Sequence, residues 1–202
     1  GHVAGIPARV QRVSFSGELS FEISVPADYG AWLWERIMTL GEPHGATAYG
    51  TEAMHVLRAE KGFIIVGQDT DGSISPLDLG MAGLISERKD CLGKRSLQRP
   101  ELLRPDRPHW VGLQPLDPER VVPEGAQLIE RGRGTPPVPM TGWVTSSYYA
   151  PRLGHAFALG FVNGGRDRHG QILTAWDADA GEIAVRIVDP VQYDPEGARQ
   201  HV

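Results

Sequence analysis

The chain has 202 residues, of which 41% are hydrophobic and 22% are charged, and its formal net charge is −5. This composition is typical of a globular protein with one large domain or two small ones, and it argues against nucleic acid as a partner because no stretch is densely basic. A single cysteine excludes an internal disulfide framework, and no apolar run approaches the length of a membrane span, so we expect a cytoplasmic protein without a membrane partner.

The two residues before Val3 are Gly-His, which suggest a tag remnant on an excised fragment.

The first structural signal is the stretch VSFSGELSFEI, residues 13–23. These residues alternate apolar and polar side chains, which predicts a strand with one buried face and a possible bend at Gly17. The polar face carries small serines around Glu18 and Glu22, which leave room beside a carboxylate.

Two helices are predicted next. The first ends near Gly41 and has apolar residues at helical spacing. These residues are Trp32, Leu33, Ile37, Met38 and Leu40. The second begins at Thr51, a candidate N-cap, and ends at Gly62. FIIVG, residues 63–67, then predicts a short buried strand.

A turn-rich loop over 68–80 and a short helix after Gly93 complete the first half. The proline-rich stretch RPELLRPDRP predicts a stiff linker, so we expect a domain boundary between Gln98 and Pro108, with domains at 3–98 and 108–202.

The second half consists of six short apolar segments bounded by Gly, Pro or Asp. They are HWVGLQPL, AQLIE, MTGWVTSSYY, AFALGFV, QILTAW and EIAVRIV. This spacing predicts a small antiparallel barrel or sandwich, with NGGRDRHGQ as a loop or hairpin tip. The chain as a whole is therefore expected to have an α+β fold.

Common catalytic signatures are absent: the sequence has no Walker loop, CxxC, HExxH or GxSxG motif. The seven histidines lack metal-ligand spacing, so no metal site is expected. The stretch DTDGS, residues 69–73, starts like a calcium loop but lacks the closing glutamate, which favours a turn. Glu22 is the remaining candidate. It is either a solvated edge carboxylate or a clamp that accepts two parallel N–H bonds from a planar edge such as that of a pterin.

Motifs along nearly the whole chain resemble the glycine-cleavage aminomethyltransferase (T-protein) family. VSFSGELSFEI is similar to the family pattern GYTGEDGFEI, LRAEKG to LRLEAG, and KDCLGKRSL to KxFIGKEAL. GQDTDGSISPLDLG is similar to YGxDxDxxxxPxExGL, and GWVTSSYYAPRLGHAFALGFV to GxVTSGxxSPTLxxxIALGYV. Within this family, the chain most resembles the carboxy-terminal region of the alpha subunits of bacterial heterotetrameric sarcosine oxidases.

The resemblance implies a partial folate-binding aminomethyltransferase domain of mixed sheet and helices, followed by a small antiparallel β-barrel. It implies an oxidoreductase complex that demethylates sarcosine and captures the one-carbon unit on tetrahydrofolate as the 5,10-methylene form. NAD, FAD, FMN and zinc would bind elsewhere in the complex. The expected partners are the other subunits, the upstream part of the same chain and the small-molecule folate, and the isolated fragment is expected to be inactive.

The resemblance also assigns candidate folate-binding residues. Glu22 matches the family glutamate that holds the pterin, and Phe15 matches a tyrosine of the folate pocket, so its hydroxyl is lost. Met54 replaces an arginine that binds the folate tail. Tyr193 corresponds to a family tyrosine near the carboxy terminus. No catalytic residue is assigned here, because the family aspartate that acts near folate N5 and N10 lies upstream of this fragment.

Other residues receive structural assignments. Arg58 and Glu60 are interpreted as scaffold ions, and Asp69 and Asp71 do not replace the upstream aspartate. Cys91 lies where a related iron–sulfur branch has KGCYxGQE, but the motif is broken, which favours a small buried cysteine.

The aromatic residues of the second half, Trp143, Tyr148 and Tyr149, are expected in the barrel, with a partner-subunit contact left open. Three alternatives remain for the function. They are a stand-alone aminomethyltransferase, which Met54 disfavours, an iron–sulfur-linked folate protein, which the broken motif around Cys91 disfavours, and a non-catalytic folate-binding or assembly module.

Overall fold

The structure is a computed structural model that describes residues 1–132 and 137–201. The chain divides into two compact units, one formed by residues 1–58 with the segment from 194 onward and the other by residues 59–193. The boundary expected between Gln98 and Pro108 remains a prediction. None of the helices in the described ranges is both long enough and apolar enough to cross a membrane.

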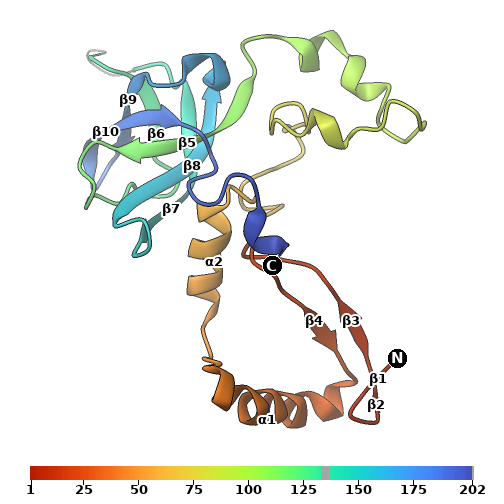
Figure 1. The fold of residues 1–202 in the computed structure, drawn as a ribbon. Helices are drawn as coiled ribbons and strands as arrows, with labels where there is room; N and C mark the ends of the chain where they lie inside the picture. The colour runs from red at the N-terminus through yellow and green to blue at the C-terminus, as the bar shows by residue number, and fades with distance from the viewer. Residues whose placement is uncertain (133–136, 202) are drawn as a thin grey trace. The chain divides into compact units, whose positions relative to one another are not determined.

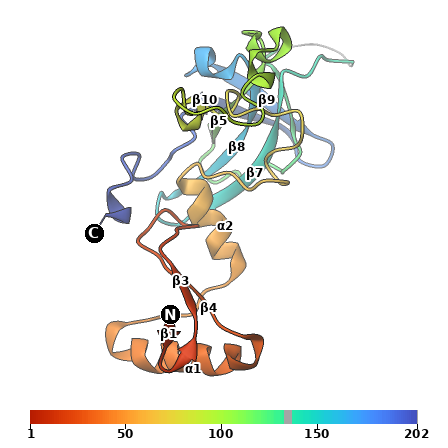
Figure 2. The same ribbon diagram turned by 90° about the vertical axis from the view of Figure 1, so that its right-hand side faces the viewer.

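The first unit contains two short antiparallel β-ribbons. Strands β1 (His2–Val3) and β2 (Ile6–Pro7) form one, and β3 (Arg9–Gln11) pairs with β4 (Glu22–Ser24) in the other. Figure 2 shows β3 and β4 running side by side as a narrow ribbon. In this ribbon Val10 lies opposite Ile23, and Gln11 lies opposite Glu22.

The prediction of a continuous strand over residues 13–23 is wrong, because β4 begins only at Glu22. Gly17 adopts a left-handed φ of +76°, which turns the chain sharply and ends the alternation of faces. Two residues later, the Leu19 N–H binds the Arg199 carbonyl at 3.0 Å instead of a neighbouring strand. The apolar positions of the stretch are consequently exposed, including Phe21 at 56%.

Both predicted helices are present in the structure, as α1 (Gly30–Gly41) and α2 (Thr51–Glu60). A short 3₁₀ turn extends α1 to His44, so the left-handed stop residue is Gly45, at φ +73°, rather than Gly41. In α2 the Met54 N–H donates to the Gly50 carbonyl at 3.4 Å, which gives the cap position to Gly50 rather than Thr51.

Residues 63–67 do not form the buried strand that their apolar run predicts. Their one ladder contact is an isolated bridge between Val66 and Thr70, and Val66 is 82% exposed. The reason is local competition: the Asp69 carboxylate accepts the Ile65 N–H at 2.8 Å, and the Ile65 carbonyl accepts the Asp69 N–H at 2.9 Å. These bonds close a tight turn and leave no free edge for a strand.

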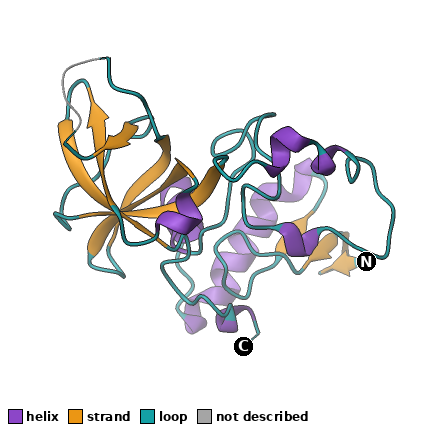
Figure 3. Cartoon of the chain, turned by 90° about the horizontal axis from the view of Figure 1, so that it is seen from above, coloured by secondary structure: helices purple, strands orange, loops and turns teal. Residues whose placement is uncertain are grey.

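The segment from 68 to 107 is irregular, as expected for 68–80, and its helices are short 3₁₀ turns. These turns are Ala82–Leu84, Ser96–Gln98 and Pro100–Leu103. Figure 3 shows this part mainly as loop, in contrast to the strands that follow it in the chain.

The rest of the second unit is a closed antiparallel barrel (Figure 1). Its strands are β5 (Pro108–Pro115), β6 (Gln127–Glu130), β7 (Gly142–Ala150), β8 (His155–Asn163), β9 (Ile172–Asp177) and β10 (Gly181–Val188). They follow the order β10-β5-β8-β7-β6-β9 around the barrel. Because β8 and β9 are not neighbours, the segment between them is a crossing loop and not a hairpin tip.

The barrel core follows from the period-two pattern of its strands. In β10 every second residue, Ile183, Val185 and Ile187, is buried inside the apolar core. Strands β7 and β8 approach closely at Gly142, where an added Cβ would lie 2.1 Å from the Phe161 carbonyl oxygen. This crowding explains why glycine is required at that point of the closed sheet.

A buried ion pair between Asp78 and Arg107 links the irregular segment 68–107 to the start of the barrel at β5. Arg107 Nε donates to Asp78 Oδ1 at 2.8 Å and Nη2 donates to Oδ2 at 2.6 Å, and Oδ2 also accepts the Ser75 N–H at 2.8 Å. The Asp78 side chain is only 2% exposed. Burial works to raise the pKa of Asp78, but the bonds from Arg107 and Ser75 outweigh it and lower this pKa below its ordinary value.

Candidate functional site

Glu22 is presented to solvent by the β3–β4 ribbon. It is the first residue of β4, its side chain is exposed, and Gln11 of β3 lies directly opposite. Opposed residues of an antiparallel pair share a face, so the carboxylate and the Gln11 amide point to the same side. This geometry leaves the carboxylate accessible to a ligand, and it fits a solvated edge residue equally well.

The space beside the other carboxylate of the motif is already occupied by the chain itself. Glu18 receives Arg199 Nε at 2.8 Å and 2.6 Å on its two oxygens. The small serines of the motif therefore make room for the carboxy-terminal segment at Glu18, and not for an external ligand there.

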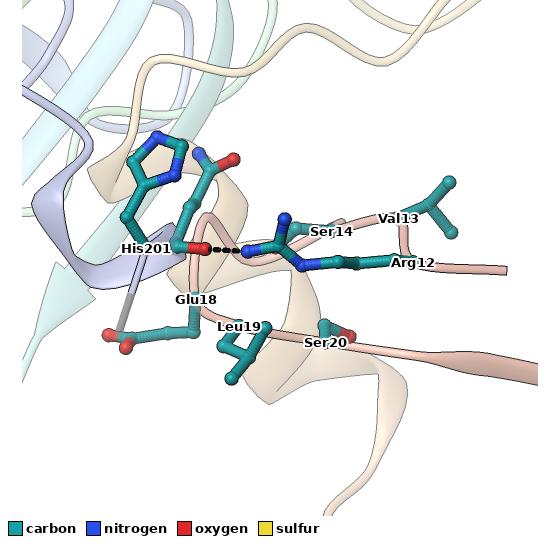
Figure 4. A pocket seen from close by; sticks show the side chains of 8 residues that line it. Arg12, Val13, Ser14, Glu18, Leu19, Ser20 and His201 are labelled. Carbon is teal, nitrogen blue, oxygen red and sulfur yellow. Dashed lines mark hydrogen bonds between the residues drawn. The ribbon is translucent and has the colours of Figure 1, made fainter.

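A small hollow lies next to this ion pair (Figure 4). It is lined by Arg12, Val13, Ser14, Glu18, Leu19, Ser20, Gln200 and His201. The Arg12 guanidinium donates to the Gln200 carbonyl across it. With a volume of about 90 Å³ the hollow is smaller than the roughly 300–1,000 Å³ of common ligand pockets, so it does not hold a whole folate.

Phe15 contacts His55, the residue that follows Met54 on α2, and all three residues belong to the first unit. The Phe15 ring is 40% exposed and lies 6.5 Å from the ring of His55, with the two planes tilted by 43°. His55 is adjacent to the half-buried Met54 on α2. The contact gives Phe15 an aromatic partner on the helix that carries Met54, and both residues stay predictions as folate contacts.

Tyr193, the fourth candidate, belongs to the second unit. Its backbone N–H and that of Gln192 both donate to the Glu60 carbonyl, at 2.9 and 2.8 Å. The Arg152 guanidinium lies over the Tyr193 ring at 4.3 Å from the centroid, and the Lys61 ammonium lies 5.9 Å from it. Tyr193 is thus held at the end of α2, with two basic side chains beside its ring.

Asp69 and Asp71 have structural surroundings. The buried Asp69 carboxylate accepts the hydroxyls of Thr145 at 2.6 Å and Ser146 at 2.7 Å, at the irregular point of β7. Asp71 accepts the hydroxyl and the N–H of Ser73, and these bonds lower the pKa of Asp71. The DTDGS stretch therefore forms a turn, as expected.

The structural assignments of Arg58, Glu60 and Cys91 have different outcomes. Arg58 and Glu60 are 1% and 2% exposed, which agrees with a scaffold role. Cys91 is exposed, so the expected burial is wrong: the residues around it form an open turn instead of packing into the core. Among the aromatic residues, Trp143 stacks on Phe161 in the barrel.

Tyr148 and Tyr149 point to opposite sides of β7. Tyr148 is 8% exposed and contacts Phe157, whereas Tyr149 is 39% exposed. A contact with a partner subunit stays a prediction.

Sequence reasoning missed Arg152 and Lys61, although their signal was present. Arg152 stands in APRL where the quoted family pattern has SPTL, and Lys61 stands in LRAEKG where the pattern has LRLEAG. Asp78 and Arg107 were also missed, because 29 residues separate them and no local motif joins them.

Two family models match the chain in order: the GCVT N-terminal domain over residues 1–89 and the glycine cleavage T-protein C-terminal barrel domain over residues 109–194. The chain therefore belongs to the glycine-cleavage T-protein family. The fold agrees, since the crystal structure of glycine cleavage system aminomethyltransferase T from Bartonella henselae superposes with a TM-score of 0.73. That match covers 92% of this chain and 49% of the other, at 21% identity.

The curated relatives at higher identity include alpha subunits of sarcosine oxidases. The chain is 47% identical to the sarcosine oxidase subunit alpha of Corynebacterium sp. (strain U-96), over 98% of this chain. It is 41% identical to the sarcosine oxidase subunit alpha of Rhizobium meliloti (strain 1021), over 95% of this chain. In both cases it spans 20% of the relative's length.

Proposed function

We propose that this chain is the folate-handling part of a sarcosine oxidase alpha subunit. In this proposal it binds tetrahydrofolate and helps to capture the one-carbon unit of oxidative sarcosine demethylation as 5,10-methylenetetrahydrofolate. The observation that carries the proposal is the 47% identity to a sarcosine oxidase subunit alpha over 98% of this chain. The complex works in the cytoplasm together with other subunits and with the upstream part of the same polypeptide.

Glu22 is the proposed pterin clamp. A pterin presents two adjacent N–H donors along one edge, and a carboxylate accepts such a pair in two parallel, charge-assisted hydrogen bonds. The exposed position of Glu22 at the start of β4 leaves both oxygens accessible, and Gln11 across the ribbon adds an amide on the same face.

Phe15, Met54 and Tyr193 complete the proposed binding set. Phe15 supplies an aromatic surface without a hydroxyl, and Met54 supplies a soft apolar contact without a charge. The oxidation itself takes place at a flavin bound outside these residues. NAD and zinc also bind elsewhere in the complex. The role of this chain is then to hold tetrahydrofolate so that the released one-carbon unit is trapped between N5 and N10.

A stand-alone aminomethyltransferase is a second candidate, favoured by membership in the T-protein family. Met54 argues against it, because a neutral thioether stands where the family pattern has an arginine for the folate tail. A non-catalytic assembly module is the third candidate. It is favoured by the small hollow of about 90 Å³ and by the Arg199–Glu18 pair that takes up the space next to it.

The test is product partition in the full-length protein with its co-purifying subunits. Sarcosine is supplied with and without tetrahydrofolate, and amine oxidation, free formaldehyde and methylenetetrahydrofolate are followed together. We expect Glu22→Gln to leave the oxidation rate unchanged and to shift the product toward free formaldehyde. Glu182→Gln, which changes an exposed strand carboxylate of the barrel, is the matched control. An unchanged partition in Glu22→Gln contradicts the assignment of Glu22.

A further inference from the structure

The small hollow beside the Glu18–Arg199 pair has a buried polar atom in its wall. Ser14 lines this hollow, and its buried hydroxyl oxygen has no hydrogen-bond partner within residues 1–132 and 137–201. Buried hydroxyls in folded proteins nearly always have a partner, because an unsatisfied one destabilises the fold. The orphaned Ser14 hydroxyl therefore indicates that a further polar group completes this hollow.

Arg12 brings a positive charge to the same hollow. Its Nη2 donates to the Gln200 carbonyl (Figure 4), and this is the one hydrogen bond that Arg12 makes in the described part of the chain. A guanidinium presents parallel N–H donors along two edges, and a single bond from Nη2 occupies only one of them. The other edge remains for a planar acceptor such as a carboxylate.

The remaining charges at the hollow do not oppose an anion. The Glu18 carboxylate also lines it, but both of its oxygens accept the Arg199 Nε, at 2.8 and 2.6 Å, so this carboxylate already has a counter-charge. His201 adds an imidazole to the lining, and Ser20 adds a second hydroxyl. The surplus positive charge of Arg12 therefore favours a monovalent anion.

The size of the hollow limits what it can hold. Its volume of about 90 Å³ equals that of about three water molecules at roughly 30 Å³ each, which suits an anion of three or four non-hydrogen atoms. The four proposed folate contacts are not among the described residues that line it. The hollow is thus formed by a separate set of side chains.

We propose that this hollow is a binding site for a small monocarboxylate of the size of formate or acetate. The remaining edge of the Arg12 guanidinium donates two parallel N–H bonds to the carboxylate. The Ser14 hydroxyl, after rotation about its χ1 bond, donates a third. The bound anion satisfies this hydroxyl and links the segment after β3 to the carboxy-terminal segment at Gln200. The inference does not depend on the proposed folate function.

The test counts the acetate bound per chain in the full-length protein with its co-purifying subunits, by equilibrium dialysis of radiolabelled acetate. Wild type is compared with Arg12→Met, which removes the guanidinium, and with Ser14→Ala, which removes only the orphaned hydroxyl. Arg9→Met, which removes another exposed arginine of the same unit, is the matched control. The differences between the variants separate this hollow from other acetate sites of the complex.

We expect Arg12→Met to bind one equivalent of acetate fewer than wild type, and Arg9→Met to bind as wild type does. Ser14→Ala should weaken the same site roughly tenfold, because a hydrogen bond to a charged group is lost. Formate should displace the acetate. Acetamide, which has the shape but not the charge, and benzoate, which is too large, should not.

Equal acetate binding in wild type and Arg12→Met overturns the inference, and so does displacement by acetamide or benzoate that equals displacement by formate. Unchanged acetate affinity in Ser14→Ala contradicts it as well. This variant keeps the test decisive if Arg12→Met fails to fold, because the Ser14 hydroxyl has no partner to lose within the described ranges. Each of these results leaves the proposed function intact, since tetrahydrofolate binding is measured separately.

Discussion

The ion pair between Asp78 and Arg107 gives the sharpest stability prediction. Asp78→Asn keeps the shape of the side chain but removes its charge. The side-chain nitrogen then faces other donors in either orientation: Arg107 Nε at the Oδ1 position, or both Arg107 Nη2 and the Ser75 N–H at the Oδ2 position. These contacts are 2.8, 2.6 and 2.8 Å in the wild type. The substitution therefore leaves a guanidinium that is only 12% exposed without its counter-charge.

The expected cost is about 2–4 kcal/mol of unfolding free energy. Breaking a buried ion pair on one side costs on the order of 3–5 kcal/mol. The lower value applies here because Arg107 Nη2 keeps a bond to the Ser73 carbonyl at 2.7 Å. By contrast, Arg104 pairs with Glu101 and Asp106 in the open, so Arg104→Met should leave the unfolding free energy close to that of the wild type.

Urea unfolding of Asp78→Asn, Arg107→Met and the double variant measures this directly. Tryptophan fluorescence is a suitable signal, because Trp110 lies next to the ion pair: its backbone N–H donates to the backbone carbonyl of Asp78 at 2.9 Å. We expect a coupling energy of roughly 1–3 kcal/mol between the two substitutions. Additive effects within about 0.5 kcal/mol would refute the reasoning.

The pair also sets a pH dependence. The pKa of Asp78 is lowered in the folded chain, so folding favours the ionised carboxylate. Its stabilisation is complete above the unfolded-state pKa of about 3.9 and is lost as the pH falls through the lower folded-state pKa. The stability difference between wild type and Asp78→Asn should therefore be constant from pH 7 to pH 5 and shrink below about pH 4.

Three further substitutions have defined outcomes. Gly142→Ala should cost about 1–3 kcal/mol in thermal unfolding, since the new Cβ meets the Phe161 carbonyl at 2.1 Å, whereas Gly72→Ala, with open space around it, should not. Asp69→Ala should cost roughly 2–4 kcal/mol, because it removes the carboxylate that accepts the Ile65 N–H and the buried Thr145 and Ser146 hydroxyls, and an unshifted melting temperature would contradict this role. Cys91→Ser should change neither stability nor metal content, and an iron–sulfur absorption band or stoichiometric zinc in the wild type would contradict the structural assignment of this thiol.

The barrel was predictable because each strand carries its own signal. Ile183, Val185 and Ile187 are large apolar residues at every second position of β10, and the turns between strands have Gly, Pro or Asp. The closure of the sheet was not predictable, since it depends on which strands meet and on an irregularity after Val144 in β7. Such pairings join residues far apart in the sequence and leave no local period.

The two wrong strands have the same kind of cause. Residues 13–23 alternate as a strand does, but their Leu19 donor is taken by Arg199, about 180 residues later. The apolar run at 63–67 is closed into a turn by Asp69, whose carboxylate binds both this turn and β7. At the candidate site, the exposure of Glu22 agrees with the polar face expected from the sequence. The contacts of Arg152 and Lys61 with the Tyr193 ring could not be predicted, because they join residues far apart in the sequence.

The most direct test of folate binding is a calorimetric titration of tetrahydrofolate into the full-length protein with its co-purifying subunits. A charge-assisted bidentate contact is worth on the order of 1.5–3 kcal/mol, so Glu22→Gln should weaken the affinity roughly ten- to a hundredfold. Glu182→Gln should bind as wild type does. Equal affinity of the wild type and Glu22→Gln would contradict the account and leave Glu22 as a solvated residue at the start of β4.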